Sequence, residues 1–308
     1  MAEAAGEFAY ISWLRQRTPA DPRVPIGPGD DAAAIRLTPG VDALVTTDML
    51  LDGSCFDLGA AGPYRVGRKA MAVNLSDMAA MAGRPVAAFV SVGLPRIGAA
   101  VIAGELYRGL RSVADEFDTA VAGGDTNTWD GPLVISVTVI GEPSGRGPVR
   151  RSGAKPGDWL FVTGPLGGSI RGHHLDFTPR VREAIRLHEQ LNLHAMMDIS
   201  DGLAVDLAKL CAESGCGAVL AADAIPISAA ALAMNDGTSP LEHALGDGED
   251  FELLFAVGPD EGARLAAQPM VAGVQLHRVG TCVGDGLWLE RDGERRTLEA
   301  KGYEHRFG

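Results

Sequence analysis

Apolar residues recur with two different spacings along this chain, and the two spacings predict different elements. In the stretch 98–117 apolar residues lie three or four positions apart, which predicts an amphipathic helix. A similar stripe, with alanine and methionine filling much of the remainder, predicts a helix over 66–83. Short apolar runs bounded by glycine, proline or aspartate predict buried strands at 43–48, 85–95, 119–126 and 132–141.

The second half of the chain mixes both spacings without a strict alternation of strand and helix. Its patterns predict strands at 159–164, 217–222, 251–257, 274–280 and 287–292, and helices at 179–191, 203–214 and 261–268. The segment 142–157 is rich in glycine, proline, serine and arginine, so we expect two domains, 1–142 and 143–308. Both halves favour an α+β (mixed α/β) fold over a doubly wound parallel sheet.

Charge and composition limit which kinds of partner this chain is expected to bind. Its 308 residues carry a net charge of −13, whereas nucleic acids and anionic membranes select basic patches, so neither is an expected partner. No apolar run approaches the roughly 18 residues of a membrane span, and the N-terminus lacks the pattern of a secretory signal. Four irregularly spaced cysteines indicate neither a disulfide framework nor a zinc site. We therefore expect a cytoplasmic protein.

Seven aspartates fall at turns or at the ends and interior of predicted elements. They are Asp30, Asp31, Asp48, Asp77, Asp125, Asp198 and Asp201. Such residues are usually helix caps or turn residues, but a cap explains neither the adjacent pair at 30–31 nor Asp77 near the middle of its predicted helix. Lys69 is at best a distant partner for that buried carboxylate. Hard oxygen ligands suit Mg²⁺ ions that also bind substrate phosphates, so the set predicts several Mg²⁺ ions.

Two other patterns leave alternatives open. The chain has no Walker A loop and no dinucleotide-binding glycine motif, but "TGPLGGS" at 163–169 could offer backbone N–H groups to a phosphate or form a structural turn. His173 and His174 could suggest a metal site. No further soft ligands cluster nearby, so a surface loop is the expected interpretation.

Taken together, the motifs resemble those of the bacterial thiamine-monophosphate kinase family. They are, in order, "GPGDDAAAI", "TTDML", "KAMAVNLSDMAAMAGRP", "GGDTN", "RSGAKPGD", "DISDGL", "GEDFELLF" and "KGYEH". The family belongs to the superfamily of aminoimidazole-ribonucleotide synthetase and selenophosphate synthetase. The resemblance implies an N-terminal ATP- and Mg²⁺-binding domain that dimerises through its β-sheet, a C-terminal α+β domain, and a homodimer.

The resemblance also implies roles for individual residues. The positions that match metal ligands of the family are Asp31, Thr46, Thr47, Asp48, Asp77, Asp125, Asp198 and Asp201. Asp30 is implied to contribute through water. The implied catalytic set is Asp31, Asp48, Asp77, Asp125 and Asp201. ATP-contacting positions are matched by Gly124, Asp125, Arg151 and Ser200. Glu249 and Tyr303 match positions that contact thiamine phosphate, although a tyrosine so near a C-terminus is also a common packing residue.

Two departures concern the acceptor substrate. The family pattern D-x-L-x-x-G-x-H-F reads "DMLLDGSCF" here, which places Cys55 where a substrate-contacting histidine is usual; we expect it to line the pocket and not to act as a nucleophile. The segment 164–198 is shorter than usual by about one helix. The expected activity is phosphorylation of thiamine monophosphate to thiamine diphosphate by ATP. The alternatives are another ATP-using synthetase of the superfamily and a catalytically silent nucleotide-binding paralogue.

Overall fold

The computed structural model describes residues 7–28 and 31–303, and the chain divides into two compact units. Unit 1 comprises Met1–Met78 and Arg84–Pro143, and unit 2 comprises Ala79–Gly83 and Ser144–Gly308. The short segment 79–83 belongs to unit 2 because Met81 and Ala82 accept backbone hydrogen bonds from Val149 and Ser144.

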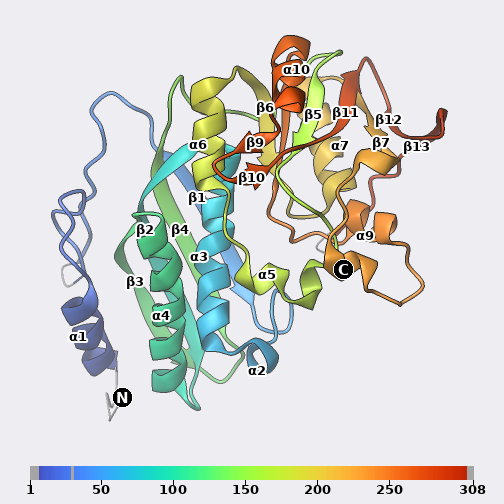
Figure 1. Ribbon diagram of the computed structural model, residues 1–308. Coiled ribbons are helices and arrows are strands. Elements are labelled where there is room, and N and C mark those ends of the chain that lie inside the picture. The colour runs from blue at the N-terminus through green and yellow to red at the C-terminus, as the bar shows by residue number, and fades with distance from the viewer. Residues whose placement is uncertain (1–6, 29–30, 304–308) are drawn as a thin grey trace. The chain divides into compact units, whose positions relative to one another are not determined.

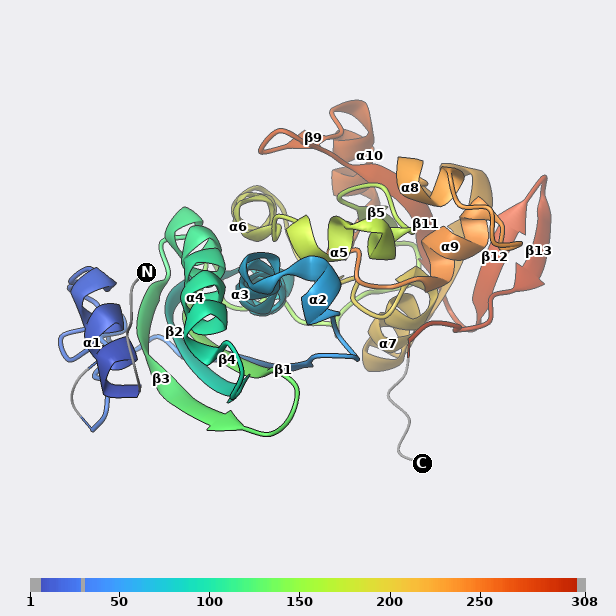
Figure 2. The same cartoon turned by 90° about the horizontal axis from the view of Figure 1, so that it is seen from below.

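Unit 1 is a four-stranded sheet with two long helices on one face (Figures 1 and 2). The strand order is β1-β4-β2-β3, in which β1 and β4 are antiparallel and β2 and β3 parallel. The strands are β1 (Leu44–Leu51), β2 (Gly83–Pro95), β3 (Ala120–Trp129) and β4 (Val134–Pro143). The helices are α1 (Glu7–Arg17), α2 (Leu58–Ala61), α3 (Pro63–Ala80) and α4 (Ala99–Glu116). Figure 2 shows α3 and α4 side by side above the sheet, and α1 beside the edge strand β3.

Glycine allows α3 and α4 to approach closely. A Cβ atom on Gly67 would lie 2.1 Å from the carbonyl oxygen of Leu106, and one on Gly109 would lie 1.8 Å from that of Tyr64. Neither position could hold a side chain without moving a helix. Apolar residues on the facing stripes, including Val66, Leu110 and Val113, are buried at 1% exposure or less.

The two faces of β1 differ in exposure. Because side chains alternate along a strand, Thr46, Asp48 and Leu50 point to the helix-covered face. Val45 and Met49 point to the other face, where they are 62% and 63% exposed. None of the described helices of unit 1 covers that face (Figure 2). Unit 1 therefore presents an open sheet surface that carries large apolar side chains.

Unit 2 is built around a seven-stranded sheet with the order β13-β12-β7-β11-β5-β8-β6. Its strands are β5 (Trp159–Val162), β6 (Leu193–Asp198), β7 (Gly217–Ala221), β8 (Leu253–Val257), β11 (His277–Val283), β12 (Leu287–Arg291) and β13 (Glu294–Thr297). A separate two-stranded sheet consists of β9 (Met270–Val271) and β10 (Val274–Gln275). Its helices are α5 (His173–Asp176), α6 (Val181–Gln190), α7 (Leu203–Ser214), α8 (Ala229–Leu232), α9 (Pro240–Gly246) and α10 (Pro259–Ala267), with short 3₁₀ turns at Ser169–Arg171 and Ala222–Ala224. Among the described strands of this seven-stranded sheet, β7 and β12 pair in parallel and the other neighbours are antiparallel.

The two faces of the second sheet bury different sets of side chains. Helices α7 and α9 share one buried apolar cluster with strand residues such as Leu160 and Leu254. Trp159, which points the opposite way from Leu160, packs on Gly262 of α10. Among residues 7–28 and 31–303, no helix is both long and apolar enough to cross a membrane.

Most of the elements predicted by periodicity are confirmed, with two changes that affect the site. Helix α3 begins at Pro63, a favoured first helical residue, so Asp77 lies in its last turn and not near its middle. Strand β3 does not end in a glycine turn but continues to Trp129, because its parallel register with β2 runs through Gly123 and Gly124. Helices α1 and α9 and strands β6 and β13 were not predicted.

Candidate active site

In unit 1 the structure brings three predicted metal-ligand residues together on the helix-covered face of β1. Thr46 donates a short hydrogen bond from its hydroxyl to Oδ2 of Asp77. Burial, and then the neighbouring Asp77 carboxylate, raise the pKa of Asp48 to about 7. Two acidic side chains and a hydroxyl thus lie close together, where burial and the second carboxylate disfavour the charged form of Asp48.

Thr47 points away from this group. Its hydroxyl lies 3.0 Å from the Thr138 hydroxyl on β4, on the open face of the sheet. The alternation of strand side chains therefore separates Thr47 from Thr46 and Asp48. On the side of Thr46 and Asp48, Thr47 could contact a ligand through its backbone but not through its side chain.

Asp31, Gly124 and Asp125 line a pocket of about 1080 Å³ within unit 1. The pocket lies among α1, residues 27–28 and 31–33, and strands β2 and β3, and Tyr10 and Tyr107 contribute aromatic rings to its wall. Gly124 is required by geometry, because a Cβ there would lie 1.9 Å from the carbonyl oxygen of Val90. This close approach of β3 to β2 fixes the backbone that carries Asp125.

Asp48, which neighbours Asp77 of α3, and Asp125 lie in different regions of the unit 1 sheet. Asp48 lies on β1 and Asp125 on β3, and these are the two edge strands. Three strand spacings, or about 14 Å along the sheet, separate them. Asp30 lies outside the described residues.

Cys55 lies in the loop after β1 and is half-buried. Its carbonyl oxygen accepts a hydrogen bond of 2.6 Å from Nζ of Lys69, which is only 1% exposed. Sequence reasoning considered Lys69 only as a partner for Asp77. The structure shows in addition that this buried ammonium group fixes the loop that carries Cys55.

In unit 2 the turn "DISDG" joins β6 to α7 and is fixed by a residue that the sequence analysis missed. Asp206, fully buried in the first turns of α7, accepts hydrogen bonds of 2.9 Å from the backbone N–H groups of Ser200 and Asp201. Lys209, one turn further along, pairs with Asp206 at 2.9 Å and also with Asp201. An acidic residue in the first turns of a helix is the signal that could have identified Asp206.

The loop 247–251, which contains "GEDF", packs directly on this turn. Glu249 and Phe251 donate backbone hydrogen bonds of 2.7 and 2.8 Å to Ser200 and Ile199. Both residues have positive φ angles, 54° and 50°, a strained conformation for residues other than glycine. Tyr303 donates its backbone N–H to the Asp201 carbonyl oxygen at 3.0 Å. Unit 2 therefore gathers the predicted residues Ser200, Asp201, Glu249 and Tyr303 around one turn.

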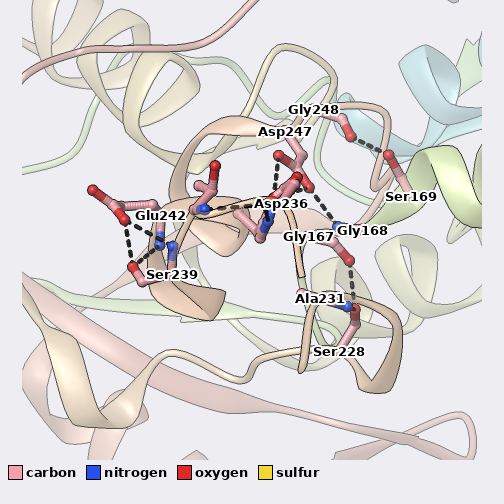
Figure 3. Close-up of polar contacts among 12 residues, drawn as sticks. Gly167, Gly168, Ser169, Ser228, Ala231, Asp236, Ser239, Glu242, Asp247 and Gly248 are labelled. Atoms are coloured by element: carbon pink, nitrogen blue, oxygen red, sulfur yellow. Dashed lines mark hydrogen bonds and ion pairs between the residues drawn. The ribbon is translucent and has the colours of Figure 1, made fainter. Parts of the chain in front are cut away.

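The glycine-rich segment 163–169 proves to be a structural turn. The backbone N–H of Gly167 donates to a carboxylate oxygen of Asp250 at 2.9 Å. The backbone N–H of Gly168 donates to Asp247 at 2.7 Å (Figure 3). These two N–H groups are therefore already used within the fold.

The surface-loop expectation was wrong, because both histidines lie in a helix and one of them is buried. His173 and His174 lie in the short helix α5, and His174 is buried with Nδ1 2.8 Å from the Ser169 carbonyl oxygen. His173 is exposed, and its Nε2 lies 3.0 Å from the Asp250 carbonyl oxygen.

Two further predicted residues of unit 2 lie at different distances from the turn between β6 and α7. Asp198 is buried at the end of β6, directly before the turn. Arg151 is exposed, and its carbonyl oxygen accepts a hydrogen bond from Ser214 at the far end of α7. The intervening helix is about 17 Å long, so unit 2 does not bring Arg151 to the turn.

Across the described part of the chain, no group of three or more His, Cys, Asp or Glu side chains could hold a metal ion.

Comparison with known proteins identifies the family. The N-terminal domain of AIR synthase related proteins matches residues 29–142, and the C-terminal domain of these proteins matches residues 155–287. A thiamine-monophosphate kinase of Rhodopirellula baltica is 45% identical over 292 residues, covering 92% of this chain and 91% of that protein. This chain belongs to the thiamine-monophosphate kinase family. The resemblance stated from the motifs is thereby confirmed.

Solved structures of this family have the same fold. The thiamine-monophosphate kinase from Stenotrophomonas maltophilia K279a superposes with a TM-score of 0.81 at 34% identity, covering 94% of this chain and 97% of that chain. The structure of AaThiL complexed with AMPPCP and TMP gives a TM-score of 0.76 at 29% identity, covering 98% and 97%. The predicted two-domain fold class is confirmed by these likenesses.

Proposed function

We propose that this chain is an ATP-dependent kinase that converts thiamine monophosphate into thiamine diphosphate. The similarity to a named thiamine-monophosphate kinase over 92% of the chain carries the proposal. The similarity of the fold to AaThiL complexed with AMPPCP and TMP supports it further. A terminal phosphate oxygen of thiamine monophosphate attacks the γ-phosphorus of ATP in line, the bond to the β-phosphate oxygen breaks, and ADP leaves. That oxygen is already anionic near neutral pH, so no strong general base is needed.

The acidic residues fit a role in holding Mg²⁺ together with ATP phosphates. Mg²⁺ is usually bound by one or two carboxylates, with phosphate and water completing its six ligands, so the pair Asp48–Asp77 with Thr46 suits it. Burial and the neighbouring Asp77 carboxylate raise the pKa of Asp48, and a bound cation would offset both effects. We assign Asp31, Asp125, Asp198 and Asp201 to the same task, with Thr47 contributing through its backbone. When bound, Mg²⁺ supplies neutralisation of the phosphate charges.

We assign the remaining predicted residues to the two substrates. Gly124 and Asp125, which line the pocket of unit 1, contact ATP together with Arg151 and Ser200. Cys55, Glu249 and Tyr303 contact thiamine phosphate. In this assignment residues 1–142 form the ATP- and Mg²⁺-binding, dimerising domain, and 143–308 the C-terminal domain.

We also propose a cytoplasmic homodimer. All four cysteines are free thiols, which suits a reducing compartment. The open sheet face of unit 1 exposes Val45, Met49 and Leu51, and exposed apolar surface of this kind is typical of an interface. A second copy of the chain is the occupant that the family resemblance implies.

The test is ATP consumption by the purified protein with Mg²⁺, using thiamine monophosphate, free thiamine or no acceptor. Formation of ADP and thiamine diphosphate with the monophosphate alone is the expected result. If ATP binds but is not consumed with thiamine monophosphate or with free thiamine, the proposal is refuted. That outcome would favour a synthetase with another acceptor or a silent paralogue.

A further inference from the structure

One histidine of unit 2 lies between two carboxylates and takes no part in the chemistry described above. His243 is on α9 and is only 3% exposed. Its Nδ1 lies 2.9 and 3.0 Å from the two carboxylate oxygens of Asp247, and its Nε2 lies 3.2 Å from Oδ1 of Asp236. Because carboxylates only accept hydrogen bonds, both ring nitrogens must donate, and only the protonated imidazolium can do this.

The two carboxylates differ in what lies beyond them. Asp236 is half-exposed, and its Oδ1 also accepts the backbone N–H of Thr238 at 3.0 Å. Asp247 faces inward, and its Oδ2 accepts the backbone N–H of Gly168 at 2.7 Å. A continuous series of polar contacts therefore runs from the exposed segment 233–239 to the glycine-rich turn.

The glycine-rich turn holds the loop 247–251 by three contacts, two of which, Gly168–Asp247 and Ser169–Gly248, are drawn in Figure 3. Besides the Gly168–Asp247 bond, Ser169 donates its hydroxyl to the Gly248 carbonyl oxygen at 2.6 Å, and Gly167 donates its N–H to Asp250. Side chains are excluded from the turn itself. A Cβ on Gly167 would lie 2.6 Å from the Ala244 nitrogen of α9, and one on Gly168 would lie 2.6 Å from the Ala231 nitrogen of α8. The turn is thus fixed against both helices and provides a rigid support.

The loop needs this support because its backbone is strained. Glu249 and Phe251, both with positive φ, would relax to ordinary conformations if the surrounding bonds were lost. The bonds to Ser200 and Ile199 hold one side of the loop, and Asp247 holds the other through Gly168. The position of Glu249 therefore depends on the orientation of Asp247.

We propose that His243 is a positioning residue for the acceptor substrate: it orients Asp247, and thereby fixes the strained loop that presents Glu249. This inference rests on the proposed function, in which Glu249 contacts thiamine phosphate. The geometry of the inner contact, from Nδ1 to Asp247, carries the positioning effect. The outer contact to Asp236 keeps the ring oriented and charged. The hydrogen bond that the ring donates to Asp247 raises the pKa of His243 above its usual value, in accord with a protonated ring.

Two substitutions of His243 separate positioning from simple packing. His243→Asn places an amide nitrogen near the former Nδ1, so it keeps the inner contact to Asp247. His243→Gln places the amide nitrogen near the former Nε2, so it keeps only the outer contact to Asp236. Both remove the positive charge, so both should lower thermal stability to a similar degree. Asp236→Asn, which leaves the inner contact in place, serves as a further control.

The expected result is a difference between the two variants in KM alone. His243→Gln should raise the KM for thiamine monophosphate roughly tenfold, while the KM for ATP and kcat remain close to those of the wild type. His243→Asn and Asp236→Asn should leave all three within about twofold. Equal changes of KM in the Gln and Asn variants, or no change in either, would overturn the proposal.

Amide hydrogen exchange gives a readout that does not need turnover. The segments 167–169 and 247–251 should exchange faster in His243→Gln than in His243→Asn. If the wild type fails to phosphorylate thiamine monophosphate, the proposed function fails, and the exchange comparison still decides whether His243 positions the loop. If His243→Gln does not fold, Asp247→Asn provides the test: exchange in 247–251 no faster than in wild type would refute the positioning role.

Discussion

Asp48 is a half-buried acidic side chain beside a second carboxylate, Asp77, and this environment fits a cation site better than a structural role. A structural carboxylate would be paired with a basic side chain or bonded to several N–H groups, which would lower its pKa. Here burial and the second carboxylate raise the pKa of Asp48 instead. An arrangement that costs folding free energy is typical of functional sites.

Asp77→Asn tests this interpretation. The amide keeps an oxygen that can accept the Thr46 hydrogen bond, so we expect the fold to be retained. It removes one negative charge from the proposed Mg²⁺ site, so ATP turnover should fall by several orders of magnitude. Circular dichroism and ADP release measure the two effects separately. A folded and fully active variant would show that Asp77 is not a metal ligand.

Cys55→Ala tests whether the thiol only lines the acceptor pocket. Its loop is fixed by the buried Lys69 through a backbone carbonyl group, which the substitution leaves intact. We therefore expect a higher KM for thiamine monophosphate, with kcat reduced severalfold at most. A loss of kcat by several orders of magnitude would instead indicate covalent chemistry at the sulfur atom. Steady-state kinetics with both substrates varied provides the measurement.

Asp250 predicts a dependence of stability on pH. Burial raises its pKa to about 8 from an ordinary value of 3.8, so the folded chain binds a proton that the unfolded chain releases. Its contribution to stability must therefore decrease as pH rises from about 4 to about 8. Asp250→Asn keeps an oxygen acceptor for the Gly167 N–H and cannot ionise. In urea unfolding at pH 5 and pH 8.5, the variant should lose less stability between the two values than the wild type. Identical losses would contradict a neutral Asp250.

At the scale of single elements, the contact between α3 and α4 predicts the effect of one methyl group. Alanine favours a helix over glycine by about 1 kcal/mol, so Gly109→Ala should stabilise an isolated α4. In the folded chain the new Cβ would lie 1.8 Å from the Tyr64 carbonyl oxygen, and the helices would have to separate. Overpacking of this kind typically costs about 1–3 kcal/mol, so we expect net destabilisation. Arg108→Ala, which loses only an exposed ion pair with Glu105, is the matched control in thermal unfolding.

The elements also show what the sequence could and could not predict. Long, regular patterns such as that of α4 were predicted almost to the residue, because one buried stripe dominates the sequence. Strand β6 was missed because both of its faces are buried, so it shows no alternation between apolar and polar positions. The roles of Asp206 and Lys209 depend on contacts between a helix and the turn before it. The contacts of His243 depend on the folding of a loop over α9, which no spacing reveals.

At the scale of the whole molecule, the open face of the unit 1 sheet favours assembly. Asp48 points to the other, helix-covered face, so an interface through the open face would leave the Asp48–Asp77 pair uncovered. The open face of the same sheet exposes Val45 and Met49, which a monomer would leave in contact with water. Dimerisation through this face would bury both.

Met49→Glu should therefore change the oligomeric state more than the fold. The side chain is 63% exposed in the single chain, so a charge there costs little in a monomer. In a symmetric interface each copy contributes the same residue, and two unpaired carboxylates would be buried together. Analytical ultracentrifugation should show a dimer for the wild type and a monomer for Met49→Glu. Glu105→Gln, on α4 and outside this face, should remain dimeric. A wild type that sediments as a monomer, or a Met49→Glu variant that remains a dimer, would exclude this face as the interface.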